Sequence, residues 1–491
     1  MQACRCYNHE GASRAEAPDV PYIRPEGAPE RASRLGHVRT ALDPSVHAAL
    51  AAFHLPPAAL EPPPIAELLV EAATLPASGL PTPVYAVSVD GSMQEVEVRP
   101  EFPSARVGFA QVAGVFSNLT AFTPAPRGGF VDPAAIARAT NAALVKGVVP
   151  TSVVTIRPGQ TQHEAWRETV HDVFTNCRLD GPTGVTTTLV DVLAHVLGAP
   201  GGPIDHVVLE KCPGRHDRDC SNGGLFVPLG GASCPACRTA VYFTDATNTH
   251  DEVVESGSNL TALGRLMSVL EMLTFLWQVR IFASADAGRV LPRTAFILDG
   301  PLAMFGRPAG LKRSALRFLQ AIHAEERAGG RPGLPVIVGV EKTGTLAEHA
   351  EHISAHIPPG YLLTLPDAYI RDHVQHRGGS RAYGYDTDYG RRFIYRARDG
   401  RTIVFSVPPL PDGDPTDDAV VVDLRRYPTL DTTVALLDRV GTMLYRNAVI
   451  PIALAHSFAS LPLGTGSQVL TYLAQDTLGT PRTPARPSPV G

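Results

Sequence analysis

The chain has 491 residues, 44% hydrophobic and 19% charged, which is typical of a folded globular protein and excludes a fibrous or wholly disordered one. Its formal net charge of -5 excludes a polycation, so any nucleic-acid binding must come from local basic patches. The seven cysteines are an odd number, and the N-terminus lacks the apolar core of a secretory leader. We therefore expect a cytoplasmic protein with neither a disulfide framework nor a membrane-spanning segment.

The first half of the chain predicts short helices, a strand meander and then longer helices. The strand pattern VYAVSVDGS (Val84–Ser92) runs into an acid and a turn at Asp90. Alternating residues predict two further strands, Met93–Arg99 and Ala105–Ser117. The helices that we expect around this meander are Ser45–Phe53, Ile65–Ala73, Asp132–Lys146, Gln162–Cys177 and Thr186–Leu197.

The second half predicts single strands that alternate with helices. A long helix, Asn259–Ala283, is apolar nearly all round and should be buried. The run RTAFILDGPL then forms a buried strand that stops at Asp299, since Gly and Pro follow it. The remaining expected helices are Lys312–Arg327, Thr343–His356, Leu430–Tyr445 and Pro451–Leu461, and the remaining strands are Leu334–Val340, Thr402–Val407 and Ala419–Leu424.

A meander followed by strands alternating with helices predicts an α/β fold: an RNase H-like mixed sheet flanked by helices, with a small zinc-ribbon-like insert. The predicted division is a mobile N-terminus with short helices (1–80), the first part of the core (81–205), the insert (206–245), the remainder of the core (246–476) and a disordered proline-rich tail (477–491).

Four residues at ends of strands or in apolar helices are candidates for a metal site. Asp90 and Asp299 follow apolar strands, Glu271 lies in the long apolar helix, and His456 lies in PIALAHSFASLP. Carboxylate oxygens suit Mg²⁺ or Mn²⁺, and a histidine favours Mn²⁺. Two such ions activate water and stabilise a phosphodiester leaving group. The alternatives are a common Asp-Gly turn, a glutamate paired with arginine, and a histidine of the core.

Cysteines in the region 206–245 have the spacing of a zinc site. Cys234-Pro-Ala-Cys237 is a zinc knuckle, and Cys212 and Cys220 provide a second, wider pair in CPGRHDRDC. Four thiolates leave no open position, so we expect structural Zn²⁺, with His216 as a possible substitute for one ligand. Free cysteines or a redox pair are the alternatives.

An arginine-rich stretch, residues 371–401, alternates with aromatic residues. Arginines neutralise phosphates and aromatic rings stack on unpaired bases, so the stretch predicts nucleic-acid contacts. The alternative is a solvated hairpin whose arginines pair with nearby aspartates. The residues that we assign to nucleic-acid binding are Lys342, Arg381, Tyr389, Arg391 and Arg392.

These motifs, in this order, resemble the NurA nuclease family from about Val84 to Leu461. The matching segments are VSVDGS, a helix with R-x5-E, FILDGPL, a strand that runs into Lys342, and P-x-x-L-A-H. The resemblance implies an RNase H-like core, homodimers, Mn²⁺-dependent cleavage of DNA, and a hexameric HerA-type ATPase as partner in end resection or antiphage defence. It also implies metal ligation by Asp90, Glu271 and Asp299, with His456 completing the site. The cysteine insert departs from the compact archaeal pattern and is similar to longer bacterial members.

The sequence thus predicts a Mn²⁺- or Mg²⁺-dependent DNA nuclease with structural zinc. It has no Walker A motif, which fits dependence on a separate ATPase. Two alternatives stay open: a non-catalytic zinc-ribbon protein for DNA binding or assembly, and an RNase H-like nuclease acting on RNA.

Overall fold

The structure is a computed structural model that divides into two compact units, Met1–Ala58 and Ala59–Gly491. It describes residues 22–23, 29–30, 36–54, 64–122, 140–180, 186–284, 290–375, 381–418, 420–441, 449–461 and 465–478. The first unit contains strands β1 (Tyr22–Ile23) and β2 (Pro29–Glu30) and helices α1 (Gly36–Ala41) and α2 (Pro44–Ala51). Asp43 caps α2 by accepting a 2.8 Å hydrogen bond from the backbone N–H of Ser45. The predicted disordered tail lies outside the described residues from 479 onward.

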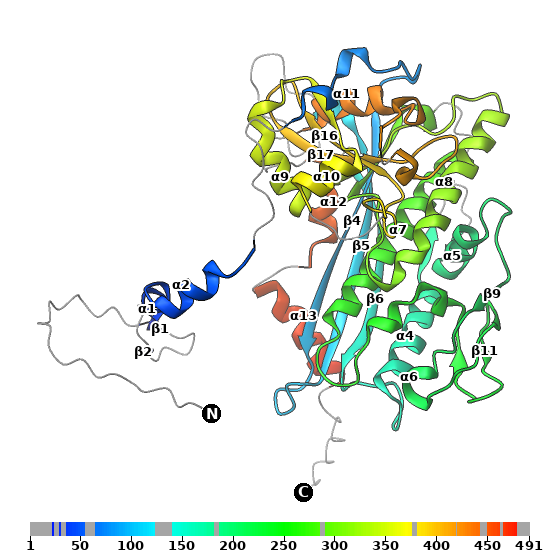
Figure 1. The fold of residues 1–491 in the computed structure, drawn as a ribbon. Coiled ribbons are helices and arrows are strands. Elements are labelled where there is room, and N and C mark those ends of the chain that lie inside the picture. The colour runs from blue at the N-terminus through cyan, green and yellow to red at the C-terminus, as the bar shows by residue number, and fades with distance from the viewer. Residues whose placement is uncertain are drawn as a thin grey trace, which may run out of the picture. The chain divides into compact units, whose positions relative to one another are not determined.

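In the second unit, nine strands of the described residues form one mixed sheet (Figure 1). In spatial order they are β3 (Leu69–Glu71), β15 (Tyr361–Thr364), β16 (Arg391–Arg396), β17 (Thr402–Val407), β14 (Ile337–Glu341), β13 (Thr294–Asp299), β4 (Tyr85–Glu97), β5 (Arg106–Asn118) and β6 (Thr140–Ser152). Strands β4, β5 and β6 form an antiparallel meander, and β13 and β14 run parallel to β4 on its other side. This arrangement confirms the predicted RNase H-like mixed sheet.

Alternate residues of the central strands enter two separate hydrophobic cores, as the period of a strand requires. Val87, Phe296 and Leu298 pack into one core with helices α4 (Gln162–Asn176), α5 (Leu189–Gly198), α7 (Leu260–Ser284) and α8 (Leu311–Ala328). Ala295 and Ile297 pack into the other with α11 (Leu430–Val440) and α12 (Ile450–Ala459). Because both faces of β13 are covered, its sequence is a continuous apolar run.

The second unit also contains the helices α9 (Thr345–Ile353), α10 (Asp367–His373) and α13 (Thr465–Leu478). Helices α9 and α10 pack on β15 and β16 in a smaller core. The insert consists of β9 (His206–Leu209), α6 (Arg215–Arg218), β10 (Leu225–Pro228), β11 (Ala232–Ser233) and β12 (Ala240–Val241).

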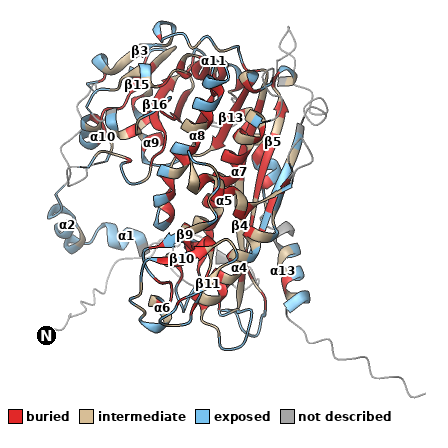
Figure 2. Cartoon of the chain, turned by 90° about the vertical axis from the view of Figure 1, so that its right-hand side faces the viewer, coloured by how far each residue is buried: buried red, intermediate tan, exposed pale blue. Residues whose placement is uncertain are grey.

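Helix α7 is the central helix of the larger core. In the described residues it is the one helix long and apolar enough to cross a membrane by length and composition, although we expected no such segment. Most of its apolar side chains are instead buried against the sheet and against α8, as expected for a core helix. Figure 2 shows buried residues concentrated along the sheet and the helices packed on it.

Asp90-Gly91-Ser92 is not the predicted turn. Strand β4 continues through these residues to Glu97, and Asp90, Gly91 and Ser92 pair with Ala113, Val112 and Gln111 of β5. The predicted strands on either side of this point are therefore one long strand. The strand has a glycine at position 91 because a side chain of the neighbouring helix approaches the backbone too closely for a Cβ atom, as described below.

Three other predicted elements are wrong where the structure describes them. Residues 140–146 of the predicted helix Asp132–Lys146 belong to β6, where Val145 and Val149 face the core, so sheet pairing overrides helix propensity. The predicted helix Ile65–Ala73 contains β3 between two single turns. The predicted strand Ala419–Leu424 has no strand in residues 420–424, where Val420 and Val421 are exposed.

Candidate functional site

Asp90 and Asp299 lie next to each other on neighbouring parallel strands. The register of β13 against β4 pairs Leu298 with Val89, which places the next residue of each strand, Asp299 and Asp90, side by side. Strand β13 ends at Asp299, and Gly300 turns the chain with a φ of +102°. Strand β4 continues past Asp90, whose side chain is 7% exposed. Asp299 is thus at the end of its strand as predicted, whereas Asp90 is in the middle of a longer one.

Helix α7 brings Glu271 to the same point of the sheet. A Cβ atom at Gly91 would lie 2.6 Å from Glu271 Oε1 and 3.0 Å from its Cδ, closer than real Cβ contacts allow. Glycine at this position therefore lets the Glu271 carboxyl approach the backbone of β4 directly beside Asp90. The sequence contained this signal in Asp-Gly-Ser, but we had interpreted the glycine as a turn residue.

Two basic side chains contact the aspartates. His456 on α12 makes a 2.8 Å hydrogen bond between its Nδ1 and Asp90 Oδ2, and its side chain is 60% exposed. Lys342, which directly follows β14, donates from Nζ to Asp299 Oδ2 at 2.7 Å. The second oxygen of Asp90 accepts a 2.8 Å hydrogen bond from the backbone N–H of Gly91. The structure therefore gathers all four predicted acidic and histidine residues, together with Lys342, at one place on the sheet.

The carboxyls at this place disfavour one another's negative charge. Burial, followed by the charge of Asp299, raises the pKa of Asp90 to about 6, against the opposing hydrogen bond from His456. Burial, followed by the charges of Asp90 and Asp299, raises the pKa of Glu271 to about 8. The phenol of Tyr389 lies near Glu271, and its buried oxygen has no hydrogen-bond partner in the described residues. A cluster of carboxyls short of positive charge, with an unpaired buried hydroxyl, fits a bound cation.

The donor set suits a hard divalent ion. Asp90, Glu271 and Asp299 supply carboxylate oxygens and His456 an imidazole nitrogen, the donors that Mg²⁺ and Mn²⁺ take. The three carboxyls do not yet have the spacing of ligands to one ion. Within the described residues, three groups bring at least three ligand atoms within 4.8 Å of one another, and none of them contains Asp90, Glu271 or Asp299. Ligation of one ion by all three carboxyls therefore requires side-chain rotation.

The side chains that we had assigned to nucleic-acid binding divide into buried and exposed ones. Tyr389 is fully buried, and Arg391 and Arg392 are 6% and 5% exposed. Arg391 donates to the backbone oxygens of Leu365 and Pro415. These three side chains are thus placed inside the fold, away from a strand of nucleic acid at the surface.

Arg392 belongs to a buried ion network rather than to a basic surface. It lies 3.1 Å from Asp388 and 3.4 Å from Glu341, and it donates to the Tyr383 hydroxyl at 2.7 Å. Arg381 is 70% exposed and pairs with Asp386 at 3.0 Å. Alternating charges and aromatic rings cannot by themselves distinguish such a network from a binding surface, because both use the same residue types.

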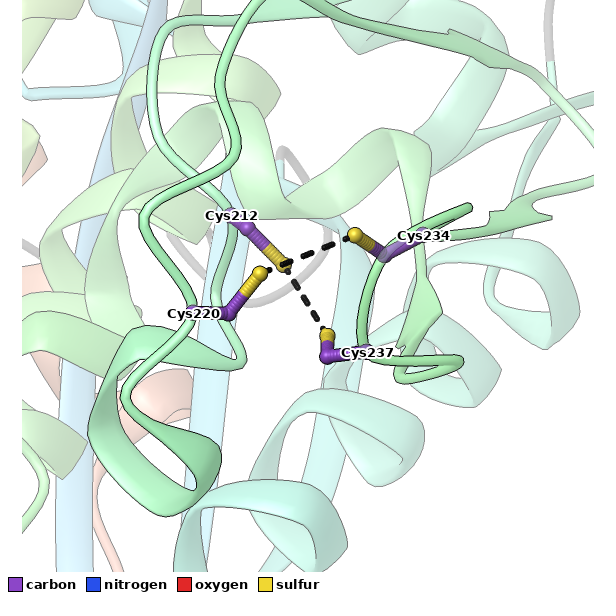
Figure 3. Close-up of side chains that lie close together, drawn as sticks. All are labelled: Cys212, Cys220, Cys234 and Cys237. Carbon is purple, nitrogen blue, oxygen red and sulfur yellow. Dashed lines mark hydrogen bonds between the residues drawn. The ribbon is translucent and has the colours of Figure 1, made fainter.

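The four cysteines of the insert meet in one cluster (Figure 3). The Sγ atoms of Cys212 and Cys237 are 3.7 Å apart, and those of Cys220 and Cys234 are 3.8 Å apart. Thiolates in a tetrahedron with Zn–S bonds of about 2.3 Å are separated by about 3.8 Å, whereas a disulfide requires about 2.05 Å. The cluster is therefore compatible with a zinc site, and His216 is not one of its ligands, since His216 pairs with Asp251 instead.

Hydrogen bonds around the cysteines support this spacing. The backbone N–H of Gly214 donates to Cys212 Sγ at 3.3 Å, and the Asn222 amide donates to Cys234 Sγ at 3.5 Å. A Cβ at Gly214 would lie 2.8 Å from Cys237 Sγ, so the loop packs closely on the sulfur atoms. Such outer contacts orient metal ligands, and the sequence pattern alone had not identified them.

No family model and no curated protein match the sequence. Solved structures that are similar to it include two crystal structures of NurA. The NurA nuclease from Sulfolobus solfataricus aligns with 83% of this chain and 88% of its own, at 9% identity and a TM-score of 0.29. A second NurA crystal structure aligns with 83% of this chain and 91% of its own, at 10% identity and a TM-score of 0.23. Superpositions this loose carry no argument about activity, which must come from the site itself.

Proposed function

We propose that the protein is a metal-dependent nuclease that hydrolyses phosphodiester bonds of DNA at the cluster of Asp90, Glu271, Asp299 and His456. The observation that supports this most is the meeting of three carboxyls, from β4, α7 and β13, on the central strands of an RNase H-like sheet. Burial, followed by the charges of the neighbouring carboxylates, raises the pKa of Asp90 and of Glu271. A divalent ion, Mn²⁺ or Mg²⁺, would balance the charge of these carboxylates.

Each residue has a distinct part in this proposal. Bound divalent ions activate water and stabilise the charge on the leaving oxygen. Asp90, Glu271 and Asp299 would hold the ions, and Gly91 lets Glu271 approach β4 beside Asp90. His456, whose side chain is largely exposed, completes the ligand set or moves a proton at Nδ1. Lys342, whose ammonium group lies beside Asp299, would contact a phosphate of the substrate.

The cysteine cluster holds structural zinc in this proposal. Four thiolates at tetrahedral spacing leave no position for a substrate, so the ion stabilises the insert and takes no part in the cleavage. A homodimer and a HerA-type DNA-translocating ATPase, in end processing or antiphage defence, are the partners and roles that follow from the family resemblance, and they stay predictions.

Nuclease assays on Asp299→Asn and Asp90→Asn test the proposal. We expect the wild-type chain to cleave DNA with added Mn²⁺ and each variant to lose about 10³-fold in rate, since the metals contribute several kcal/mol to the transition state. Asp205→Asn is the control, because the Asp205 side chain, directly before the insert, is 90% exposed and its one ion pair in the described residues is with His206. Cleavage by both variants at the wild-type rate would refute the site.

The same assay separates the rival functions. Cleavage of RNA or of an RNA–DNA hybrid in preference to DNA would favour the RNA-directed enzyme. Binding of DNA without any cleavage, at every Mn²⁺ and Mg²⁺ concentration, would favour the non-catalytic zinc-ribbon protein.

A further inference from the structure

A group of histidines and carboxylates lies between the cysteine insert and the core, separate from both sites described above. His216 belongs to helix α6 of the insert, four residues after Cys212 and four before Cys220. His250 and Asp251 belong to a single turn that precedes α7. One ligand atom of each of the three lies within 4.8 Å of the other two.

The spacing of these atoms is that of a coordination sphere. Asp251 Oδ1 lies 3.0 Å from His216 Nε2 and 3.4 Å from His250 Nε2. Nitrogen and oxygen ligands bound about 2.1 Å from one ion are separated by about 3.0 Å in octahedral and about 3.4 Å in tetrahedral geometry. From these distances we propose that His216, His250 and Asp251 bind a second, imidazole-preferring divalent ion of the zinc class.

The charge around the group also fits a divalent ion. The group and its ion-pair partners contain two guanidinium groups and four carboxylates, so with neutral imidazoles they carry an excess of two negative charges. These residues are Arg167, Arg215, Asp217, Asp245, Asp251, Glu255, His163, His216 and His250. Burial lowers the pKa of His250 to about 4, which keeps its ring in the neutral form that binds metals.

Neighbouring groups hold the ligands in place. The ring of His216 stacks on that of His163 at 4.6 Å, with 10° between the planes. His250 is 3% exposed, and its Nδ1 lies 3.8 Å from Asp245, which is itself paired with Arg167 at 2.6 Å. Arg215 donates to Asp251 Oδ1 at 2.6 Å, and the second lone pair of this oxygen, which faces His216 Nε2 at 3.0 Å, would bind the ion when that nitrogen carries no proton. Fixed rings and paired outer carboxylates are what metal-binding histidines require.

Two buried atoms beside the group have no partner. His163 Nε2 and Asp217 Oδ2 make no hydrogen bond in the described residues, although both side chains are more than nine-tenths buried. Both residues border His216, so the described residues leave two buried polar atoms beside the group without a partner that an ion and its bound water could supply.

The site would keep open positions. His250, Asp251 and Arg215 line a cavity of about 470 Å³ between the insert and the turn at Arg307–Gly310. Three protein ligands and a cavity leave room for water or another small ligand on the ion, unlike the closed cluster of four cysteines. Because His216 lies between Cys212 and Cys220 in the sequence, the cysteine cluster fixes the loop that carries His216.

Zinc content tests the proposal independently of nuclease activity. The full-length protein, equilibrated with Zn²⁺ and freed of excess metal, is compared with His216→Ala and with the control His206→Ala, a histidine of the insert that pairs with Asp205 instead. We expect His216→Ala to retain one zinc ion per chain fewer than the control. The acidic site on the sheet contributes equally to both proteins and so cancels.

X-ray absorption at the zinc edge gives a second readout. The control should show nitrogen or oxygen as well as sulfur neighbours, and the nitrogen share should fall in His216→Ala. Asp251→Asn, which keeps the side-chain size, should lose the same ion if His216→Ala does not fold. Equal zinc content and equal nitrogen share in all three proteins would overturn the proposal and leave the group as a hydrogen-bond network.

Discussion

The acidic site on the sheet and the cysteine cluster of the insert are held in opposite ways. The cysteines lie on loops, yet their sulfur atoms already have the spacing of a zinc tetrahedron. The carboxyls lie on strands and a helix of the core, yet they do not form a group of ligand atoms within 4.8 Å of one another, and two of them are hydrogen-bonded to His456 and Lys342. A closed set of ligands can stabilise a small insert, whereas carboxyls that must exchange partners suit a site where ions and substrate come and go.

Removal of one thiolate should give the largest effect on stability. Cys234→Ser should lose the zinc of the cluster and destabilise the insert by on the order of 5 kcal/mol, because metal binding is coupled to folding in small zinc sites. Zinc content and the thermal unfolding midpoint measure this. The control variant Cys177→Ser, whose cysteine lies outside the cluster, should retain the zinc of the cluster. A variant with unchanged zinc would show that the comparison between the two sites is mistaken.

The buried ion network around Arg392 should give the next largest effect on stability. Arg392→Met leaves Asp388 and Glu341 without their counter-ion and should cost about 3–5 kcal/mol of folding free energy. Arg381→Met, at an exposed position of the same stretch, should change stability by less than about 0.5 kcal/mol. Chemical denaturation of the two variants provides the comparison. Equal stabilities of the two variants would show that the ion network of Arg392 does not stabilise the fold.

The close approach of Glu271 to β4 can be tested at Gly91. Gly91→Ala places a methyl group 2.6 Å from Glu271 Oε1 and should cost about 1–3 kcal/mol while displacing the carboxyl, so cleavage should fall as well. The matched control is Gly310→Ala, where a Cβ would meet nothing within 4 Å. If Gly91→Ala cleaves DNA like the control, Glu271 is not needed at its present position.

The smallest effect should be a pH-dependent gain in stability when the carboxyl of Glu271 is replaced by an amide. Because the pKa of Glu271 is raised in the folded state, the folded protein binds the proton of this carboxyl more tightly than the unfolded chain does. The stability that the neutral carboxyl contributes is complete below its ordinary pKa of 4.5 and is lost as the pH rises through about 8. Glu271→Gln in the presence of chelator should therefore be more stable than wild type by on the order of 1–2 kcal/mol at pH 9, and the difference should shrink toward pH 5. Unfolding midpoints across this range measure it; a difference that does not vary with pH would mean that the carboxyl is well solvated.

Local sequence was sufficient where a residue's role depends on its neighbours in the chain. The apolar run before Asp299 requires a buried strand, the glycine after it permits the turn, and the all-round apolar pattern of α7 requires a core helix. The Cys234–Cys237 knuckle likewise brings two thiolates together within one turn. Local pattern failed at Gly91, because a glycine that ends a strand and one that admits a helix side chain look the same in sequence.

Tertiary structure alone decided which of these residues meet. The parallel register of β13 on β4 brings Asp299 beside Asp90, and no spacing rule specifies a register between strands so far apart in the chain. The pairing of β16 with β17 buries Arg391 and Arg392 in the sheet. The packing of the insert on the turn before α7 places His216 against His250 and Asp251 instead of against the cysteines. Sequence determined which side chains the protein has for binding metal ions, because residue type sets the donor chemistry. The packing of the sheet and the insert decided which of them share a site, because ligation depends on distances between atoms that only the folded chain brings together.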